Sequence, residues 1–281
     1  MLLWAFFYRR IAMKMRMILF LTVLFTYDTV YGGWIQFNDG GTHDIDYQIN
    51  EDVWVDYQAP NMGTTLNLLS GGKIFEHKLK GYQDSRINIL GGHMEGVLYS
   101  YDDSYVNISG GITNYVSPFG DSRVDISGGL IHYIWAYENS SVDVSNATIR
   151  DYLYAEDYTI VNIYSGTIGT DLEIWNNSQV DFFGGTIGYK LRLGDNSLLT
   201  IHGSNFTVDG QPFSGEINSI LGGGHRSEPQ RHLTGVLSSG EIIDNDFYIG
   251  NNASINLVPE PGTIVLLVTG LIACGFLLRR K

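Results

Sequence analysis

Disulfide bonds contribute nothing to the stability of this chain, because it contains one cysteine. That residue, Cys274, lies inside an apolar run close to the C-terminus. A single thiol cannot close a loop within the chain. Packing and hydrogen bonding must therefore stabilise the long segment between the two ends.

Basic residues are also scarce between the ends. Residues 33–257 contain 10 Lys and Arg against 28 Asp and Glu, which gives a net charge of −18. A surface with this charge repels the phosphates of nucleic acids and anionic lipid headgroups. We therefore expect no nucleic-acid partner.

The sequence also lacks the apolar periodicity of helices, and its composition agrees with that absence. Proline occurs only 6 times, whereas the chain has 34 Gly and 18 Tyr. Such a composition favours many short strands separated by turns over packed helices.

The first 32 residues have the features of a secretory signal peptide. Basic residues up to Arg16 precede the apolar residues 17–25, and a Val-x-Gly site ends at Gly32. Nine apolar residues rise about 14 Å as a helix, less than half of the roughly 30 Å bilayer core. We expect a signal helix at 1–32 that is removed on export. The alternative is a retained anchor helix, and Met13 or Met15 is an alternative start.

The last 24 residues form a second membrane-directed segment. Two prolines precede the apolar residues 264–278, and Arg279-Arg280-Lys281 follow them. Fifteen residues span about 22 Å as a helix, which is short for a transmembrane segment. The basic cluster is expected to stay in the cytoplasm, which places residues 33–257 outside. A plain C-terminal membrane anchor is one interpretation.

The order Pro259-Glu260-Pro261, short hydrophobic helix and Arg279-Arg280 resembles the PEP-CTERM sorting signal of exopolysaccharide-producing Gram-negative and related bacteria. The resemblance covers residues 258–281. It implies processing near the motif by an exosortase, a membrane cysteine transpeptidase. It also implies a protein that is anchored in the membrane at least transiently and then reaches the cell surface or extracellular matrix. The basic final residues argue against a eukaryotic lipid-anchor signal.

One phrase recurs through the middle of the chain: apolar, Asn or Asp, apolar, followed by small residues and glycine. Successive central residues are separated by 21, 19, 18, 18, 19, 19 and 19 positions. An Asx-Ser pair usually precedes the phrase, as Asp103-Ser104 does. The central residues are Asn67, Asn88, Asn107, Asp125, Asp143, Asn162, Asp181 and the degenerate Thr200.

A period of 18–21 residues is too short for helical-pair repeats and suits stacked strands. We predict an all-β, single-stranded parallel β-helix, right-handed, of about eight coils. Its expected divisions are the signal peptide 1–32, an N-terminal cap 33–65, the repeats 66–203, a C-terminal cap 204–257 and the tail 258–281. The repeats and the tail together resemble Asx-Ser…Ile-Ser-Gly-Gly repeat proteins that carry this sorting signal.

The alternation within each phrase predicts that the central Asn or Asp points outward. Stacked coils then place these side chains in one polar ladder, with strands about 4.8 Å apart. An Asn/Asp hydrogen-bonding ladder is the favoured interpretation. Asp125 and Asp143 form the one adjacent acidic pair, and weak calcium binding there is the alternative. We otherwise expect no metal and no cofactor.

Aromatic residues recur six positions before the central residue, as Tyr82, Tyr101, Phe119 and Tyr137. Stacked rings stabilise neighbouring coils. Sugar stacking on Tyr82, Tyr101 and Tyr137 is the functional alternative.

Catalytic signatures are weak in this sequence. The histidines share no repeat position, and no metal-ligand spacing or nucleophile–base arrangement stands out. We predict an exported, non-enzymatic structural or adhesive protein associated with exopolysaccharide or matrix. The alternative is a carbohydrate-binding or polysaccharide-degrading β-helix.

Overall fold

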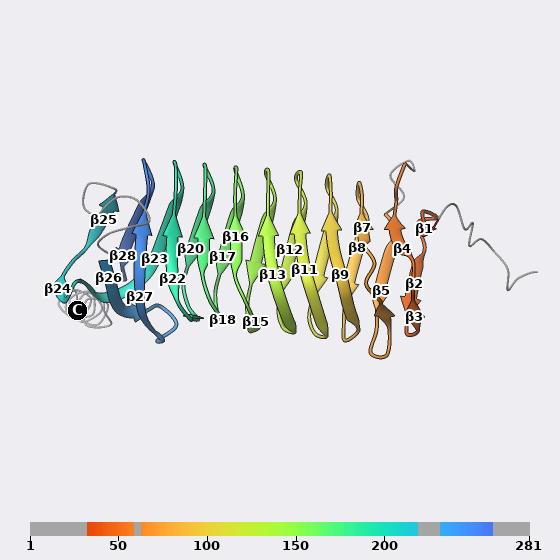
Figure 1. Ribbon diagram of the computed structural model, residues 1–281, viewed down its shortest axis with the longest axis horizontal. Helices are drawn as coiled ribbons and strands as arrows, with labels where there is room; N and C mark the ends of the chain where they lie inside the picture. The colour runs from red at the N-terminus through yellow and green to blue at the C-terminus, as the bar shows by residue number, and fades with distance from the viewer. Residues whose placement is uncertain (1–32, 59–62, 219–230, 261–281) are drawn as a thin grey trace, which may run out of the picture.

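The chain folds into one long column of stacked strand coils (Figure 1). The computed structural model describes residues 33–58, 63–218 and 231–260. About nine turns follow one another, and no helix occurs among the described residues. The predicted parallel β-solenoid is confirmed, with about nine turns where about eight were expected. The expected signal helix and C-terminal helix lie outside the described residues, within which no helix could cross a membrane.

The repeat phrase builds the first face of the column. Its strands pair in parallel and without register shift, so that Asn107 lies opposite both Asn88 and Asp125. The strands of this face are β2 (Thr42–Ile45), β5 (Thr65–Leu68), β8 (Arg86–Ile89), β10 (Tyr105–Ile108), β12 (Arg123–Ile126), β14 (Ser141–Val144), β17 (Ile160–Ile163), β20 (Gln179–Phe182), β23 (Leu198–Val208) and β28 (Ser254–Pro259).

Two further faces complete each coil, and the long strands of the middle coils bend from one to the other. The second face contains β3 (Gln48–Ile49), β6 (Lys73–Ile74), the first parts of β9 (His93–Ser100), β11 (Ile112–Pro118) and β13 (Leu130–Ala136), and then β15 (Ala147–Ile149), β18 (Gly166–Ile168) and β21 (Thr186–Ile187). The third face contains β1 (Trp34–Phe37), β4 (Asp52–Val55), β7 (Leu79–Gly81), the last parts of β9, β11 and β13, and then β16 (Leu153–Ala155), β19 (Leu172–Ile174), β22 (Lys190–Leu193) and β27 (Ile242–Ile249).

The core follows directly from the alternation of the phrase. In β10, Val106 and Ile108 are 0% and 1% exposed, whereas Asn107 between them is partly exposed. The same inward positions are filled by Val, Ile or Leu in coil after coil. Each fully buried aliphatic side chain contributes about 1.5–3 kcal/mol relative to an exposed one. The column is thus held by one continuous apolar core along its length.

Tight turns connect the third face to the first. In the turn at Tyr101, the N–H of Ser104 donates to the carbonyl of Tyr101 at 3.1 Å. Asp102 has a positive φ of 56°, and Ser104 is buried. The Asx-Ser pair Asp103-Ser104 therefore completes a turn whose preceding residue, Asp102, lies in the left-handed region, and the small serine fits inside.

The glycine pair of the repeat has a packing reason. Gly129 has a φ of +87°, and a Cβ atom there would lie 2.9 Å from the carbonyl oxygen of Gly110 on the preceding coil. Only glycine combines that conformation with such a close approach of two backbones.

The stacking begins before the first repeat phrase. Trp34 of β1 lies opposite Asp52 of β4, and Thr42 of β2 lies opposite Thr65 of β5, both in parallel register. Much of residues 33–65, expected as a cap, thus forms coils that continue the column. The indole rings of Trp34 and Trp54 stack at 4.4 Å.

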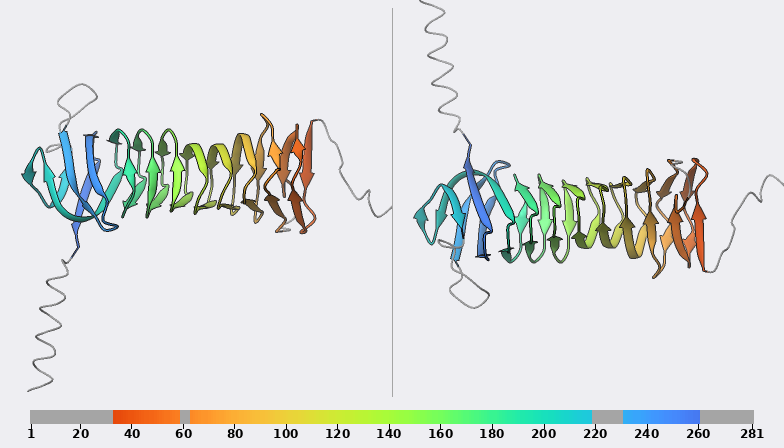
Figure 2. Two further views of the ribbon diagram at one scale, coloured as in Figure 1. Left: turned by 90° about the horizontal axis from the view of Figure 1, so that it is seen from below. Right: turned by 90° about the horizontal axis from the view of Figure 1, so that it is seen from above.

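The column ends differently at its C-terminal side (Figure 2). The 11-residue β23 continues beyond its coil and pairs antiparallel with β26 (Arg231–Leu237) and with β24 (Gln211–Pro212). β26 then pairs antiparallel with β27, and β25 (Gly215–Asn218) pairs antiparallel with β28. β27 and β28 return to the column in parallel register with β22 and β23.

Candidate functional site

The outward polar ladder on the first face forms as the repeat predicts. The Nδ2 of Asn88 donates to Asn67 at 2.7 Å, and Asn67 donates to Asp44 at the same distance. Further along, Asn162 donates to Asp143 at 2.7 Å. The side-chain amides therefore link successive coils by hydrogen bonds, as stacked Asn ladders do.

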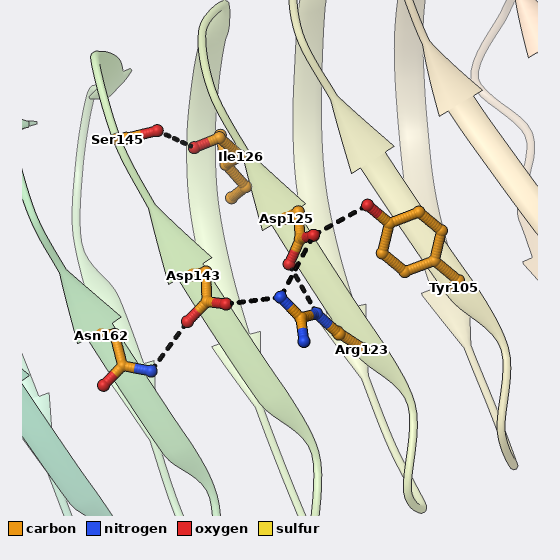
Figure 3. Close-up of polar contacts among 7 residues, drawn as sticks. All are labelled: Tyr105, Arg123, Asp125, Ile126, Asp143, Ser145 and Asn162. Atoms are coloured by element: carbon orange, nitrogen blue, oxygen red, sulfur yellow. Dashed lines mark hydrogen bonds and ion pairs between the residues drawn. The ribbon is translucent and has the colours of Figure 1, made fainter.

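The acidic pair of the ladder is held by an arginine (Figure 3). Arg123 lies between Asp125 and Asp143, with Nε 2.8 Å from Asp125 Oδ1 and Nη2 2.8 Å from Asp143 Oδ2. Tyr105 donates its hydroxyl to Asp125 at 2.8 Å. The guanidinium offsets the repulsion between the two carboxylates.

Calcium binding at Asp125 and Asp143 stays a prediction, and it would require the loss of an existing ion pair. The ion would have to displace Arg123, whose pKa is raised by its hydrogen bond to Asp125 and by the charge of that residue. Within the described ranges no group of three or more His, Cys, Asp or Glu is arranged to hold a metal. Calcium usually takes six to eight oxygen ligands, and two carboxylates supply only part of such a set.

The predicted aromatic ladder also forms, and we call it the aromatic stack: Tyr82, Tyr101, Phe119 and Tyr137. Successive ring centroids are 5.1, 5.4 and 5.0 Å apart, with interplanar angles of 15–19°. Burial is the main cause that raises the pKa of Tyr82, and the neighbouring Tyr101 adds to it. Each ring inside the stack uses its two faces on its neighbours.

That geometry bears on sugar stacking at Tyr82, Tyr101 and Tyr137. A sugar ring needs the open face of an aromatic ring, and both faces of Tyr101 lie against stacked rings. Tyr82 and Tyr137 end the stack and have the tilted rings of Tyr57 and Tyr154 on their outer sides. The edges of the rings and their hydroxyl groups remain for contact with a polymer. Sugar binding at these three residues stays a prediction that this arrangement disfavours.

The first residues of the sorting motif lie on the folded body. Pro259 ends β28, opposite Gly203 of β23. The N–H of Glu260 donates to the carbonyl of Gly203 at 2.8 Å, and its carboxylate accepts a hydrogen bond of 2.6 Å from the hydroxyl of Ser238. The motif thus follows the last strand without a linker. Pro261, Arg279 and Arg280 lie outside the described residues.

A cluster of one histidine and two aspartates in the C-terminal region was not predicted from the sequence. His232 of β26 lies 2.7 Å from Asp244 and 2.9 Å from Asp246, both on β27. The hydrogen bond to Asp246, followed by the one to Asp244, raises the pKa of His232. The Asp-x-Asp spacing on one strand was visible, but the antiparallel pairing that brings His232 to it was not. The arrangement acts as an ion-pair clasp between two strands.

Comparison with known proteins gives one match. The PEP-CTERM protein-sorting motif matches residues 257–281. No curated protein and no solved structure matches the chain. The motif is the recognition signal for exosortase, and it marks proteins that are exported and anchored in the membrane at their C-terminus before processing. This chain therefore carries the signal of an exported exosortase substrate, and a β-solenoid body fits that role.

Proposed function

We propose that this chain is a non-enzymatic structural or adhesive protein of the cell surface or the exopolysaccharide matrix. The observation that carries the proposal is the direct continuation of the coil column into the sorting motif at Pro259 and Glu260. The secretory signal peptide at 1–32 and the membrane helix after Pro261 belong to the proposal. Besides exosortase, the partners in this proposal are the export machinery, the membrane and the exopolysaccharide.

The side chains on the column surface support a structural role over catalysis. Arg123 and the side-chain amide of Asn162 are both engaged with the carboxylate of Asp143. Arg192 is engaged likewise, 3.1 Å from Asp171. A polysaccharide lyase or hydrolase needs a base or a carboxylate pair free to act on a substrate. The proposal requires no cofactor.

The test follows the full chain in an exosortase-containing host and in the same host lacking the exosortase. We expect a shortened form in the surface or matrix fraction of the first, and an unprocessed membrane form in the second. Full-length protein in the same fraction of both hosts would contradict sorting. Release of new reducing ends or unsaturated products from polysaccharides by the purified chain would instead favour the degrading enzyme.

A further inference from the structure

Trp135 of β13 and Tyr152, which directly precedes β16, are tilted against the stacked pair of Tyr115 and Tyr133 and stack loosely on each other. Tyr115 and Tyr133 stack at 4.8 Å with an interplanar angle of 13°. Trp135 lies at 57° to Tyr115 and at 48° to Tyr133. Tyr152 lies at 67° to Tyr133 but within 26° of Trp135, with ring centroids 6.3 Å apart. Trp135 and Tyr152 share one orientation, and we call this pair the aromatic platform.

The register explains why Trp135 is free to turn. On the following coil Trp135 lies opposite Tyr154. On the preceding coil its neighbour is the small Ser117, whose hydroxyl donates to the Trp135 carbonyl at 3.1 Å. No ring precedes the indole at this position, and its stacked neighbour is the ring of Tyr152. Trp135 and Tyr152 are both partly exposed.

Three carboxylates lie near the platform in sequence or register, and each uses only part of its hydrogen-bonding capacity. The carboxylate of Glu156 accepts a hydrogen bond of 2.8 Å from Tyr154. Asp151 lies 4.0 Å from His132, and Asp171 lies 3.1 Å from Arg192. A carboxylate accepts up to about four hydrogen bonds, so these groups retain acceptor sites for hydroxyl donors. Partly exposed aromatic faces edged by polar acceptors suit the apolar face and the hydroxyl edge of a sugar.

Charge narrows the class of sugar. Residues 33–257 carry a net charge of −18, which repels polymers that bear carboxylate or sulfate groups. The carboxylates nearest the platform are engaged with Arg192, His132 and Tyr154, so they do not present a bare acidic patch for a cationic partner. An uncharged polymer of sugar rings meets neither obstacle.

We propose that Trp135 and Tyr152 form a binding platform for a neutral polysaccharide. This inference deepens the proposed matrix role and rests on it. The two can fail separately, because sorting to the surface is read by fractionation and polymer binding by mobility.

The test is affinity electrophoresis of the folded full chain in detergent, in gels that contain mannan, dextran or hydroxyethyl cellulose, with alginate as the anionic polymer. We expect retardation by at least one neutral polymer and none by alginate. Trp135→Leu and Tyr152→Leu should each weaken the retardation about 10-fold, while Trp135→Phe should retain most of it.

Tyr101→Leu is the matched control, because the same type of ring is removed from a position whose faces are covered. It should bind like the unchanged chain. Retardation by none of the neutral polymers overturns the proposal, and so does equal retardation of all variants. Retardation by alginate alone overturns it as well. Far-UV circular dichroism of each variant confirms that it is folded, and Trp135→Phe and Tyr152→Leu keep the test decisive if Trp135→Leu does not fold.

Discussion

The repeat column and the C-terminal region differ in how their strands are paired at the edge of the sheet. In the middle of the column the strands of the first face are paired in parallel on both sides, as β12 is with β10 and β14. Parallel stacking always leaves another open edge, to which a further chain can add. In the C-terminal region the chain reverses direction, and β26 lies antiparallel to both β23 and β27. The comparison shows that the solenoid extends by repeating parallel coils and ends where antiparallel strands interrupt that repeat.

The two regions also differ in the contacts on their surfaces. Amide ladders and stacked rings link the coils of the column, as at Asn88 and Phe119. The C-terminal region relies on ion pairs, among them Arg231 with Asp209 at 2.6 Å and His232 with two aspartates. The column carries ion pairs as well, among them Arg123 with Asp143 and Arg192 with Asp171, so the comparison in pH rests on the raised pKa of His232.

The largest effect is expected from Ile126→Ala in the middle of the column. Ile126 is 1% exposed, and removal of such a side chain costs about 3 kcal/mol of unfolding free energy. The matched change Ile255→Ala in β28 removes a side chain that is 0% exposed. Because contacts in stacked repeats are local, Ile255→Ala should open β25–β28 before the column unfolds. Urea titration followed by hydrogen exchange measures both, and one shared transition with equal shifts would erase the distinction between the regions.

A smaller loss of about 2 kcal/mol is expected from Phe119→Ala, which interrupts the aromatic stack between Tyr101 and Tyr137. Tyr158→Ala is the control, because that ring is 64% exposed. Thermal unfolding should show a lower midpoint for Phe119→Ala at both pH 5 and pH 8. An equal midpoint for both variants would mean that ring stacking does not hold the coils together.

The C-terminal region should respond to pH through His232. Its folded pKa is raised above the ordinary 6.5, so the protonated ring stabilises the folded state fully below about pH 6.5. The contribution is lost as pH rises through the folded pKa. Since the ion pairs are partly exposed, the effect should stay below about 1 kcal/mol. After correction for the base-catalysed intrinsic exchange rate, the protection of the β26 and β27 amides should fall between pH 6 and 8, and His232→Gln should abolish that fall. Equal pH dependence in the column strands would contradict the assignment.

The sequence predicted the column better than its ends, for a physical reason. Constant spacing of the phrase implies in-register stacking, and alternation tells which residues are buried, as at Val106 and Asn107. The first coil was missed because Val53 and Val55 carry the same alternation on the third face, outside the repeated phrase. The return of β28 to β23 pairs Leu198 with Ser254, which no local period encodes.

Side-chain geometry was the least predictable from spacing. The sequence showed Asp125 and Asp143 as repelling neighbours, but the position of Arg123 between them depends on the path of a long flexible side chain. Likewise, the recurrence of aromatic residues predicted stacking without distinguishing the covered ring of Tyr101 from the turned ring of Trp135.

The smallest effect tests whether the column surface is insensitive to charge even at its acidic pair. Arg123→Gln leaves Asp125 and Asp143 facing each other, but the arginine side chain is 55% exposed. Exposed ion pairs contribute about 0–1 kcal/mol, and salt at 1 M screens them within about 3 Å. Arg86→Gln is the matched control, because Arg86 occupies the same register position and lies over the Tyr105 ring. We expect Arg123→Gln to lower the urea midpoint at 20 mM salt by more than Arg86→Gln does, and the difference to vanish at 1 M. Persistence of the difference at high salt would show that Arg123 stabilises the column through packing. The acidic pair would then be as insensitive to salt as the neutral amides on either side of it.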